Sequence, residues 1–395
     1  MKRIRKTLGI FTVKKISYYK GNYYTYGGFG LYLEEIRKYF YKTILVAHVA
    51  KKKPGEGYYL INKENLRVVH LQQSKNEFIN WITIPISFVK SYKIVKEMDI
   101  VHNRMPDYTG IIGAVLCKIH NKPFFIQIIA DWAIEAKKVP ILKKGGLGLL
   151  LKIDYYIYDF LEKLVSKNQL VFAQGISSYK KHKAHSDCRL ISSSAHYQDD
   201  ITKYSERFTN NKAVRVLNVA RLTGVKNQRL IIEAIYRLNR ETNNNWHVDF
   251  VGTGPLRQML QNLSIKLGIN RFVHFHGQID HGNDLWQYYD NSDVFVLTSR
   301  SEGTPKVLLE AMARSLPVIA SNIGGIPYLV PQGKRGLLFE ENNLDDFVKT
   351  ILKMKNNRKQ RKQMVLEGLK FAKQNTVEQT TKYMVEEVNK NFGLI

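Results

Sequence analysis

The stretch Asp293–Pro327, DVFVLTSRSEGTPKVLLEAMARSLPVIASNIGGIP, decides the fold of the second half of the chain. A short apolar run of strand type, Val294–Leu297, leads through a polar loop into a helical pattern, and Pro305 is expected near the first turn of that helix. A second buried strand, Pro317–Ala320, ends near the glycine pair Gly324-Gly325. In open α/β sheets, ligands bind beyond the carboxyl ends of the strands. This order therefore predicts two loops and a helix N-terminus at a ligand site.

Two carboxylates stand out in this stretch. Glu302 lies in the loop before the helix and Glu310 lies inside it. The free N–H groups expected around Thr304–Val307 suit a phosphate. Carboxylates beside a phosphate site suit the hydroxyls of an attached sugar or ribose. The alternative is a Glu favoured by the helix dipole together with a solvated Glu310.

Upstream, Arg221 and Lys226 follow the apolar strand Val214–Val219, around a turn that contains Gly224. Two cations at such a turn could clamp a diphosphate, the arginine as a planar fork and the lysine as a point charge. The alternative is a surface arginine and a lysine at a helix start. Gly252-Thr253-Gly254 lacks the third glycine of a dinucleotide fingerprint, so it indicates a tight turn beside a nucleotide.

Together these motifs resemble the retaining GT-B glycosyltransferases of family 4. The resemblance rests on EGTPKVLLEAMA and SNIGGIP, and upstream on VARLTGVKN, VGTGP and FHG. It covers Val214–Phe339 well and the first half of the chain more weakly. It implies an α/β protein of two facing Rossmann-like domains with a deep interdomain cleft.

The resemblance also implies roles for single residues. Glu302 would contact donor-sugar hydroxyls, Glu310 would hold the ribose, and the two cations would hold the nucleotide diphosphate. The expected catalytic residues are Glu302, Arg221 and Lys226. The expected donor-binding residues are Glu310, Gly303, Thr304, Pro305, Lys306, Val307, Gly252, Gly27 and Gly28. No covalent nucleophile is evident, so retention would rest on a front-face displacement. Because arginine and lysine supply the positive charge, no metal ion or other cofactor is expected.

The first half begins with two buried strands, expected at Leu8–Val13 and Ile44–Val49, and further strands are expected at Leu66–Leu71 and Trp81–Ile86. Between the first two lie the turn Gly27-Gly28, which matches a glycine pair of the family near the donor phosphates and acceptor, and a helical run, Leu31–Tyr41.

Two further residues are candidates for the cleft. His102 ends a strand and could face the cleft, or pack against the sheet. Many family members have a histidine after the next strand, Pro123–Ile129, where this chain has Ala130. Either Asp131 replaces its polar contact, or the acceptor geometry differs.

We expect an N-terminal acceptor-side domain over residues 1–196 and a nucleotide-sugar-binding domain over 197–375. Residues 376–395 should form a helix that returns to the first domain.

The chain has 395 residues, of which 44% are hydrophobic and 24% charged, as expected for two globular domains. Its two cysteines form no CxxC pair, so the sequence indicates neither a zinc site nor a disulfide framework and suggests a reducing cytoplasm. The basic N-terminus has too short an apolar run for a signal peptide, and no stretch is long and apolar enough to span a membrane.

The net charge is +27, and residues 1–195 contribute +19 of it. Such an excess attracts polyanions, and without any RNA-binding or zinc-finger signature we do not expect nucleic acid. The segment Lys137–Lys167 combines lysines with leucines and tyrosines, which suits an anionic bilayer. The alternative is an ordinary core helix at Ile153–Leu164 beside a solvated loop. The lysines concerned are Lys137, Lys138, Lys143, Lys144 and Lys152.

The sequence thus predicts transfer of a sugar from a nucleotide-sugar to a glycan or lipid-linked acceptor, in cell-envelope polysaccharide biosynthesis at the inner face of the plasma membrane. Two other classes stay open. One is a GT-B relative that epimerises sugar-nucleotides or phosphorolyses sugars; the other, which Ala130 keeps open, is an inactive sugar-nucleotide-binding protein.

Overall fold

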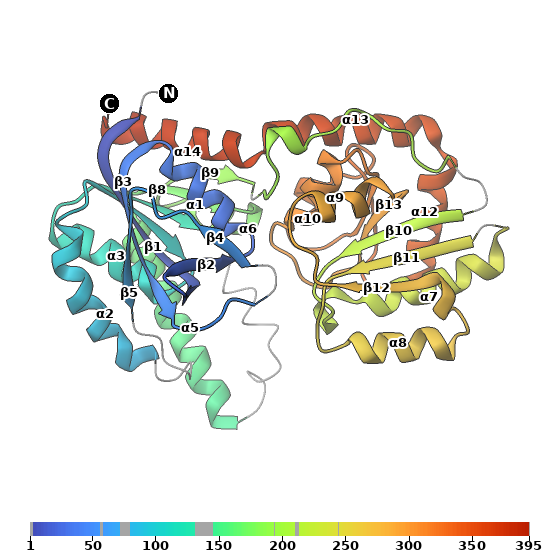
Figure 1. Ribbon diagram of the computed structural model, residues 1–395, viewed down its shortest axis with the longest axis horizontal. Helices are drawn as coiled ribbons and strands as arrows, with labels where there is room; N and C mark the ends of the chain where they lie inside the picture. Colours follow the sequence, from blue (N-terminus) through green and yellow to red (C-terminus); the bar gives the residue numbers. More distant parts are fainter. Residues whose placement is uncertain are drawn as a thin grey trace. The chain divides into compact units, whose positions relative to one another are not determined.

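The computed structural model describes residues 3–55, 58–71, 80–130, 145–192, 194–209, 213–243 and 245–394. The chain forms two compact α/β units (Figure 1). The first contains Met1–Ser192 together with Val377–Ile395, and the second contains Ser193–Thr376. The helix α14 (Val377–Phe392) therefore belongs to the first unit, where it packs against α1 (Phe29–Arg37).

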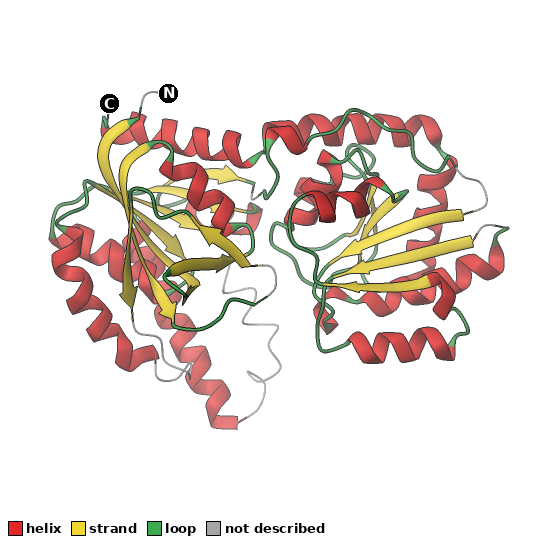
Figure 2. Cartoon of the chain, viewed as in Figure 1, coloured by secondary structure: helices red, strands yellow, loops and turns green. Residues whose placement is uncertain are grey.

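The first unit is built on a β-sheet with helices packed against it, drawn in yellow and red in Figure 2. The sheet has a parallel core in the order β5-β3-β1-β6-β7-β8-β9. These strands are β5 (Leu66–Leu71), β3 (Phe40–Ala50), β1 (Ile4–Tyr19), β6 (Ile100–Met105), β7 (Phe124–Ile128), β8 (Leu170–Gln174) and β9 (Asp187–Ile191). The end of β1 turns back into an antiparallel extension formed by β2 (Asn22–Tyr26) and β4 (Tyr58–Ile61).

Apolar side chains of this sheet alternate between its two faces, so helices cover both faces. One face packs on α1 and α14, and the other on α2 (Asn80–Val95), α3 (Tyr108–Ile119) and α5 (Gly145–Ser166). A short helix, α6 (Ile176–His182), connects β8 to β9.

Three expectations for the first unit are wrong in detail. The helix expected at Leu31–Tyr41 ends at Arg37, because Phe40 already begins β3. The strand expected at Leu8–Val13 is longer, since it continues into the hairpin. The segment expected as a strand at Trp81–Ile86 is part of α2. Its β-branched residues favour a strand only weakly, and packing of the helix on α3 prevails.

The sheet of the second unit is fully parallel, in the order β12-β11-β10-β13-β14-β15. Its strands are β10 (Ala213–Val219), β11 (Asn245–Val251), β12 (Val273–Gly277), β13 (Val294–Leu297), β14 (Val318–Ser321) and β15 (Leu337–Phe339). One face packs on α7 (Gln228–Glu241), α8 (Arg257–Lys266) and α12 (Leu344–Asn356). The other packs on α9 (Asn283–Asp290), α10 (Lys306–Ala313), α11 (Ile326–Leu329) and α13 (Arg358–Gln374).

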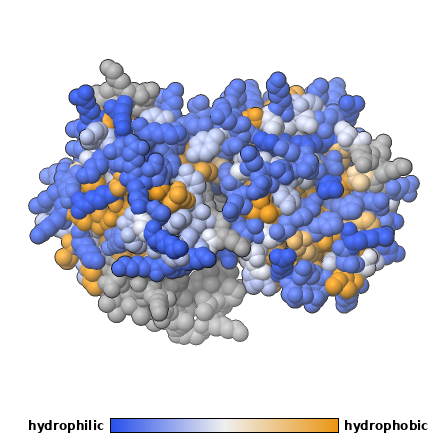
Figure 3. Space-filling view, in the orientation of Figure 1, coloured by the Kyte–Doolittle hydropathy of each residue, from blue (hydrophilic) through white to orange (hydrophobic). Residues whose placement is uncertain are grey.

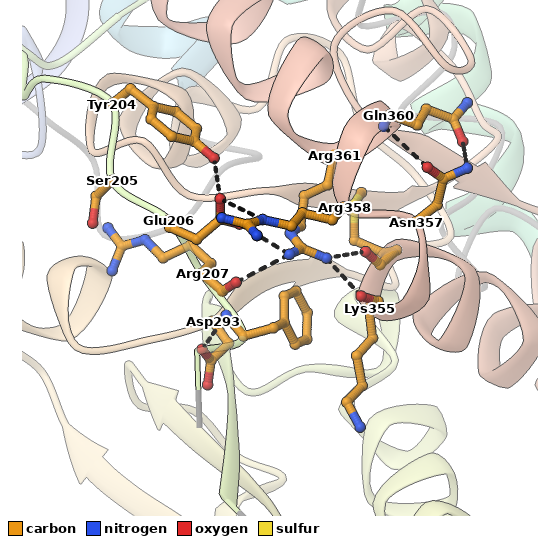
Figure 4. A network of polar contacts seen from close by, with 12 residues as sticks. Tyr204, Ser205, Glu206, Arg207, Asp293, Lys355, Asn357, Arg358, Gln360 and Arg361 are labelled. Carbon is orange, nitrogen blue, oxygen red and sulfur yellow. Dashed lines mark hydrogen bonds and ion pairs between the residues drawn. The ribbon is translucent and has the colours of Figure 1, made fainter. Parts of the chain in front are cut away.

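A partly buried polar network fixes the segment that enters this sheet (Figure 4). Glu206 accepts hydrogen bonds from Arg361 at 3.0 Å and Arg358 at 3.2 Å, while Asp293 accepts from the main-chain N–H of Phe208 at 2.8 Å. Because Asp293 immediately precedes β13, the network anchors the strand whose far end reaches the candidate site.

On the face shown in Figure 3, hydrophilic side chains predominate and hydrophobic ones form scattered groups.

Candidate functional site

The strand order of the second unit locates the site. Numbered in chain order, the six strands run 3-2-1-4-5-6, so the order reverses between β10 and β13. Ligands of open α/β sheets bind at such a reversal, beyond the carboxyl ends of the two strands. The loop after β10 carries Arg221 and Lys226, and the loop after β13 carries Glu302.

Hydrogen bonds hold the two loops together. The hydroxyl of Thr298 donates to the carbonyls of Lys226 at 3.0 Å and Asn227 at 3.1 Å. The main-chain N–H of Arg300 donates to the carbonyl of Val225 at 2.8 Å. Asn227 adopts a left-handed conformation with φ 50°, which ends the loop and starts α7. The backbone that carries Lys226 is therefore fixed relative to the backbone that carries the carboxylate.

The structure brings Lys226 and Glu302 into direct contact. Their ammonium and carboxylate form an ion pair, and the hydroxyl of Ser299 donates to the same carboxylate oxygen at 2.7 Å. The Lys226 side chain is 26% exposed and that of Glu302 is 11% exposed. Arg221 lies on the same loop with an exposed side chain, and among the described residues it forms no ion pair. Positive charge thus borders the loop that carries Glu302.

Three glycines allow the site loops to approach one another. A Cβ on Gly325 would lie 1.9 Å from the carbonyl oxygen of Gly303, and one on Gly324 would lie 2.2 Å from that of Glu302. A Cβ on Gly252 would lie 2.2 Å from the carbonyl oxygen of Ala220, the residue before Arg221. These contacts admit only glycine.

The helix after Glu302, α10, begins at Lys306. Pro305 occupies its N-cap with extended backbone (ψ 113°), next to the first turn, as expected. No side chain caps this helix start, and Gly303 is exposed. The hydroxyl oxygen of Thr304 is buried and has no hydrogen-bond partner among the residues that the structure describes. Lys306 and Val307 form the first turn and are both partly exposed. The geometry matches an anion site at a helix N-terminus.

Glu310 lies deeper than the other predicted residues. It is 5% exposed, and its carboxylate accepts a hydrogen bond of 2.7 Å from the hydroxyl of Tyr289, which comes from α9. Burial and then the charge of Glu310 raise the pKa of Tyr289 well above its usual value, so it acts as a donor. Sequence reasoning missed Tyr289, because no local pattern links it to Glu310.

The remaining predicted residues lie in the first unit. Gly27, with φ 68°, and Gly28, the N-cap, form the turn before α1. His102 is fully buried, stacks on Phe125 with ring centroids 4.6 Å apart, and has its Nδ1 3.2 Å from the hydroxyl of Tyr32. Burial lowers the pKa of His102 well below its usual value. Its ring is enclosed in the sheet layer and reaches no solvent. Asp131 lies outside the described residues.

Comparison with known families and structures identifies the chain. The family model described as "Glycosyl transferases group 1" matches residues 200–371. An uncharacterized glycosyltransferase of Methanocaldococcus jannaschii is 30% identical over 72% of this chain and 75% of its own length. The chain belongs to the group 1 glycosyltransferases. Protein CapJ of Staphylococcus aureus is 24% identical to this glycosyltransferase over 91% of this chain and 88% of its own length.

A further relative is named for its activity. The Escherichia coli UDP-Gal:alpha-D-GlcNAc-diphosphoundecaprenol alpha-1,3-galactosyltransferase is 24% identical over 68% of this glycosyltransferase and 70% of its own length.

Solved structures confirm the predicted GT-B fold class. Sucrose-phosphate synthase of Thermosynechococcus elongatus superposes with a TM-score of 0.73 at 15% identity, covering 99% of this chain and all of that one. Anabaena HepE, crystallised with UDP, superposes with a TM-score of 0.69 at 15% identity, covering 98% of this chain and all of that one.

The described residues contain neither a membrane-spanning helix nor a group of metal-binding side chains. No helix in the described part of the chain is long and apolar enough to cross a bilayer. Within the same ranges, no three His, Cys, Asp or Glu side chains converge as a group that could hold a metal ion.

Proposed function

We propose that this group 1 glycosyltransferase transfers a sugar, with retention of anomeric configuration, from a nucleotide-diphosphate donor to a glycan or lipid-linked acceptor. The observation that carries the proposal is the meeting of Lys226 with Glu302 where the strand order reverses. A cation at this place suits the donor diphosphate, and a carboxylate suits the hydroxyls of the sugar attached to it.

In this proposal, Arg221 and Lys226 stabilise the negative charge that develops on the leaving diphosphate. The main-chain N–H groups at the uncapped start of α10, from Gly303 to Val307, add donors to the same phosphates. When the donor arrives, Lys226 turns from Glu302 to the phosphate. Glu302 remains held by Ser299 and accepts hydrogen bonds from the sugar hydroxyls.

Glu310 would hold the ribose from its buried position, with Tyr289 fixing the orientation of the carboxylate. Gly252 would let the loop after β11 approach the nucleotide, and Gly27 with Gly28 would supply main-chain groups from the first unit. Retention would follow from a front-face displacement, in which the departing phosphate helps to deprotonate the acceptor. No metal is needed in this scheme, because Arg221 and Lys226 supply the charge.

The acceptor is proposed to be an envelope glycan or its lipid-linked precursor at the inner face of the plasma membrane. The E. coli relative, by its name, acts on a sugar linked to diphosphoundecaprenol. A feature of the first unit supports a membrane surface. Five exposed apolar side chains form a stripe along α5, because their spacing follows the helix period: Ile153, Tyr156, Ile157, Phe160 and Leu164.

A thermal-shift panel of UDP-, GDP- and ADP-sugars, with UDP, GDP and NAD as comparators, tests the proposal. A ligand at 100 times its Kd should stabilise the protein by about 2.7 kcal/mol. We expect one nucleotide family to raise Tm and the effect to disappear in Lys226→Ala. Transfer to an added acceptor, rather than epimerisation or phosphorolysis, should then be seen with that donor. No shift with any nucleotide would contradict the proposal.

A further inference from the structure

The sheet of the first unit has its own reversal of strand order. Counted along the parallel core, β1 is flanked by β3 on one side and by β6 on the other, so the order reverses between β1 and β6. Two cations lie near the carboxyl ends of these strands. Arg104 is the penultimate residue of β6, and Lys14 lies in a bulge of β1, where the register with β3 shifts between Thr12 and Ile16. Bulges often re-aim side chains beside binding sites.

Arg104 is a buried charge without a carboxylate. It is 5% exposed, and its guanidinium carbon lies 4.8 Å from the ring centroid of Phe29 and 4.7 Å from that of Tyr32. One terminal nitrogen donates to the side-chain oxygen of Gln127 at 2.7 Å, and the Tyr32 hydroxyl is a further hydrogen-bond partner of the guanidinium. Among the described residues, Nε has no hydrogen-bond partner. No carboxylate of the described residues forms an ion pair with it. Burial lowers its pKa to about 10, so it remains charged at neutral pH.

This arrangement is costly without a partner anion. A buried charge without an anionic partner is costly, and the two aromatic rings offset only part of that cost. The rings explain the flat packing of the guanidinium, but Nε meets no acceptor among the described residues. Lys14 adds a second positive charge. Its side chain is exposed, yet partial desolvation and then the charge of Arg104 lower its pKa.

The start of α1 points to the same ligand chemistry. Phe29, which packs on Arg104, is the first residue of this nine-residue helix. The N-cap is Gly28, no side chain caps the helix, and its first turn contains no acidic residue. A helix N-terminus presents unpaired N–H groups and partial positive charge.

We propose that Arg104, Lys14 and the N-terminus of α1 form an anion-binding subsite that takes a phosphate group of the acceptor. Arg104 would offer Nε and a terminal nitrogen as a fork, Lys14 a mobile second charge, and the helix its first N–H groups. That the anion belongs to the acceptor rests on the proposed function; anion binding itself does not.

Hydrogen exchange of the full chain, with inorganic phosphate as the probe, tests the subsite. Phosphate should slow amide exchange at residues 27–33, while acetate and sodium chloride at matched ionic strength should not. If acetate protects equally, or if phosphate leaves these residues unprotected, the assignment to phosphate is wrong. The protection by phosphate should persist in the Lys226→Ala variant, because Lys226 lies in the second unit. A loss of donor binding would therefore leave this measurement unchanged.

Variants then assign the effect to side chains. Arg104→Met should weaken phosphate binding at residues 27–33 by about tenfold or more, because the charge-assisted hydrogen bonds from the guanidinium are lost. Arg104→Lys should restore only part of it, and the exposed Lys14→Met, which leaves the core intact, should weaken binding by a smaller factor. The matched control is Arg67→Met, because Arg67 is an exposed arginine of the same sheet, paired with Glu97. Unchanged protection in both Arg104→Met and Lys14→Met would overturn the proposal.

The two sources of phosphate are separated by the same readout. UDP should slow exchange at residues 221–227 and 302–310, and also at Gly27 and Gly28, with or without Arg104. A short-chain alkyl phosphate, as a stand-in for a lipid-linked acceptor, should slow exchange at residues 29–33 only when Arg104 is present. Protection of residues 29–33 by UDP and not by the alkyl phosphate would assign the subsite to the donor and refute its role in acceptor binding.

Discussion

The ammonium of Lys226 and the carboxylate of Glu302 neutralise each other across two loops that are far apart in the sequence. The pair is partly exposed, and ion pairs in such positions contribute at most about 1 kcal/mol to folding. Its position, where the strand order reverses, therefore points to ligand binding rather than to stability.

Substitution of Lys226 or Glu302 should lower activity while leaving the stability of the fold nearly unchanged. We expect Lys226→Ala and Glu302→Ala each to lower transfer by about 10²–10³-fold, as removal of one group that stabilises the transition-state charge does elsewhere. Tm should change little. Turnover with a radiolabelled donor and thermal unfolding are the two measurements.

The matched control is Arg229→Ala, which breaks the exposed Arg229–Glu233 pair on α7 of the same unit. It should leave both turnover and Tm near the wild-type values. Wild-type-like turnover in both Lys226→Ala and Glu302→Ala would refute the proposed mechanism.

Loss of the Tyr289 hydroxyl should affect both stability and donor binding. Tyr289→Phe leaves the buried carboxylate of Glu310 short of a donor, so we expect unfolding to become easier by about 1–3 kcal/mol. If Glu310 holds the ribose, the donor Kd should also rise. Tyr288→Phe, one residue earlier and partly exposed, is the control. A destabilised protein with unchanged donor affinity would remove Glu310 from the donor site.

The glycines behind Glu302 give a steric prediction. Gly325→Ala would place a Cβ 1.9 Å from the carbonyl oxygen of Gly303, so the loop must move. We expect weaker donor binding, measured by calorimetry, together with a lower Tm. Gly224→Ala is the control, because a Cβ there meets no atom within 4 Å. Equal donor affinities for the two variants would show that the position of this loop is unimportant.

The sequence predicted the second unit better than the first. Its strands are short buried runs separated by helices with a clear apolar face, and motifs such as Glu302 to Glu310 mark the loops at the carboxyl edge. Local sequence patterns could not predict which side chains contact each other across different elements. Neither the contact of Tyr289 with Glu310 nor that of Ser299 with Glu302 follows from spacing alone.

In the first unit, tertiary packing overrode local preference. The β-branched residues near Trp81–Ile86 suggested a strand, but the segment packs as a helix. The sequence did not indicate that Arg104 is buried, because an arginine in a strand is usually solvated. In the structure, the rings of Phe29 and Tyr32 enclose its guanidinium.

The buried Glu162 should make the first unit sensitive to acid. Burial alone would raise its pKa, but hydrogen bonds and charges from His182 at 3.1 Å and Lys181 at 2.7 Å prevail and lower it. A lowered folded-state pKa contributes stability that is present above the unfolded value, about 4.3, and is lost as pH falls through the folded value. Lys181→Met should therefore shift the acid transition to higher pH, as followed by circular dichroism. Lys163→Met removes a half-exposed lysine that pairs with Asp159, so it should shift the acid transition less. Equal shifts for the two variants would contradict this account.

The exposed stripe on α5 should bind an anionic bilayer. Phe160 is 64% exposed and Tyr156 is 68% exposed, and four lysines precede this helix in the sequence, outside the described residues. Together these features complement anionic lipid, which attracts basic segments by about 1 kcal/mol per lysine near the surface. Vesicles of phosphatidylglycerol should sediment the wild-type protein but not a Tyr156→Ser, Phe160→Ser variant. Charge reversal of Lys137, Lys138, Lys143 and Lys144 should have the same effect.

Ile265→Ser is the control for the stripe, because Ile265 is 62% exposed on α8 of the second unit. It should sediment with vesicles as the wild type does. Salt must weaken the binding of the wild type, since the attraction of lysines to lipid is screened within about 10 Å at 0.1 M ionic strength. If the serine variants still bind vesicles, α5 is not the membrane surface. If instead the wild type proves dimeric by sedimentation velocity and the serine variants monomeric, the stripe is covered by a second copy of the chain, and the acceptor must be reached without this contact to lipid.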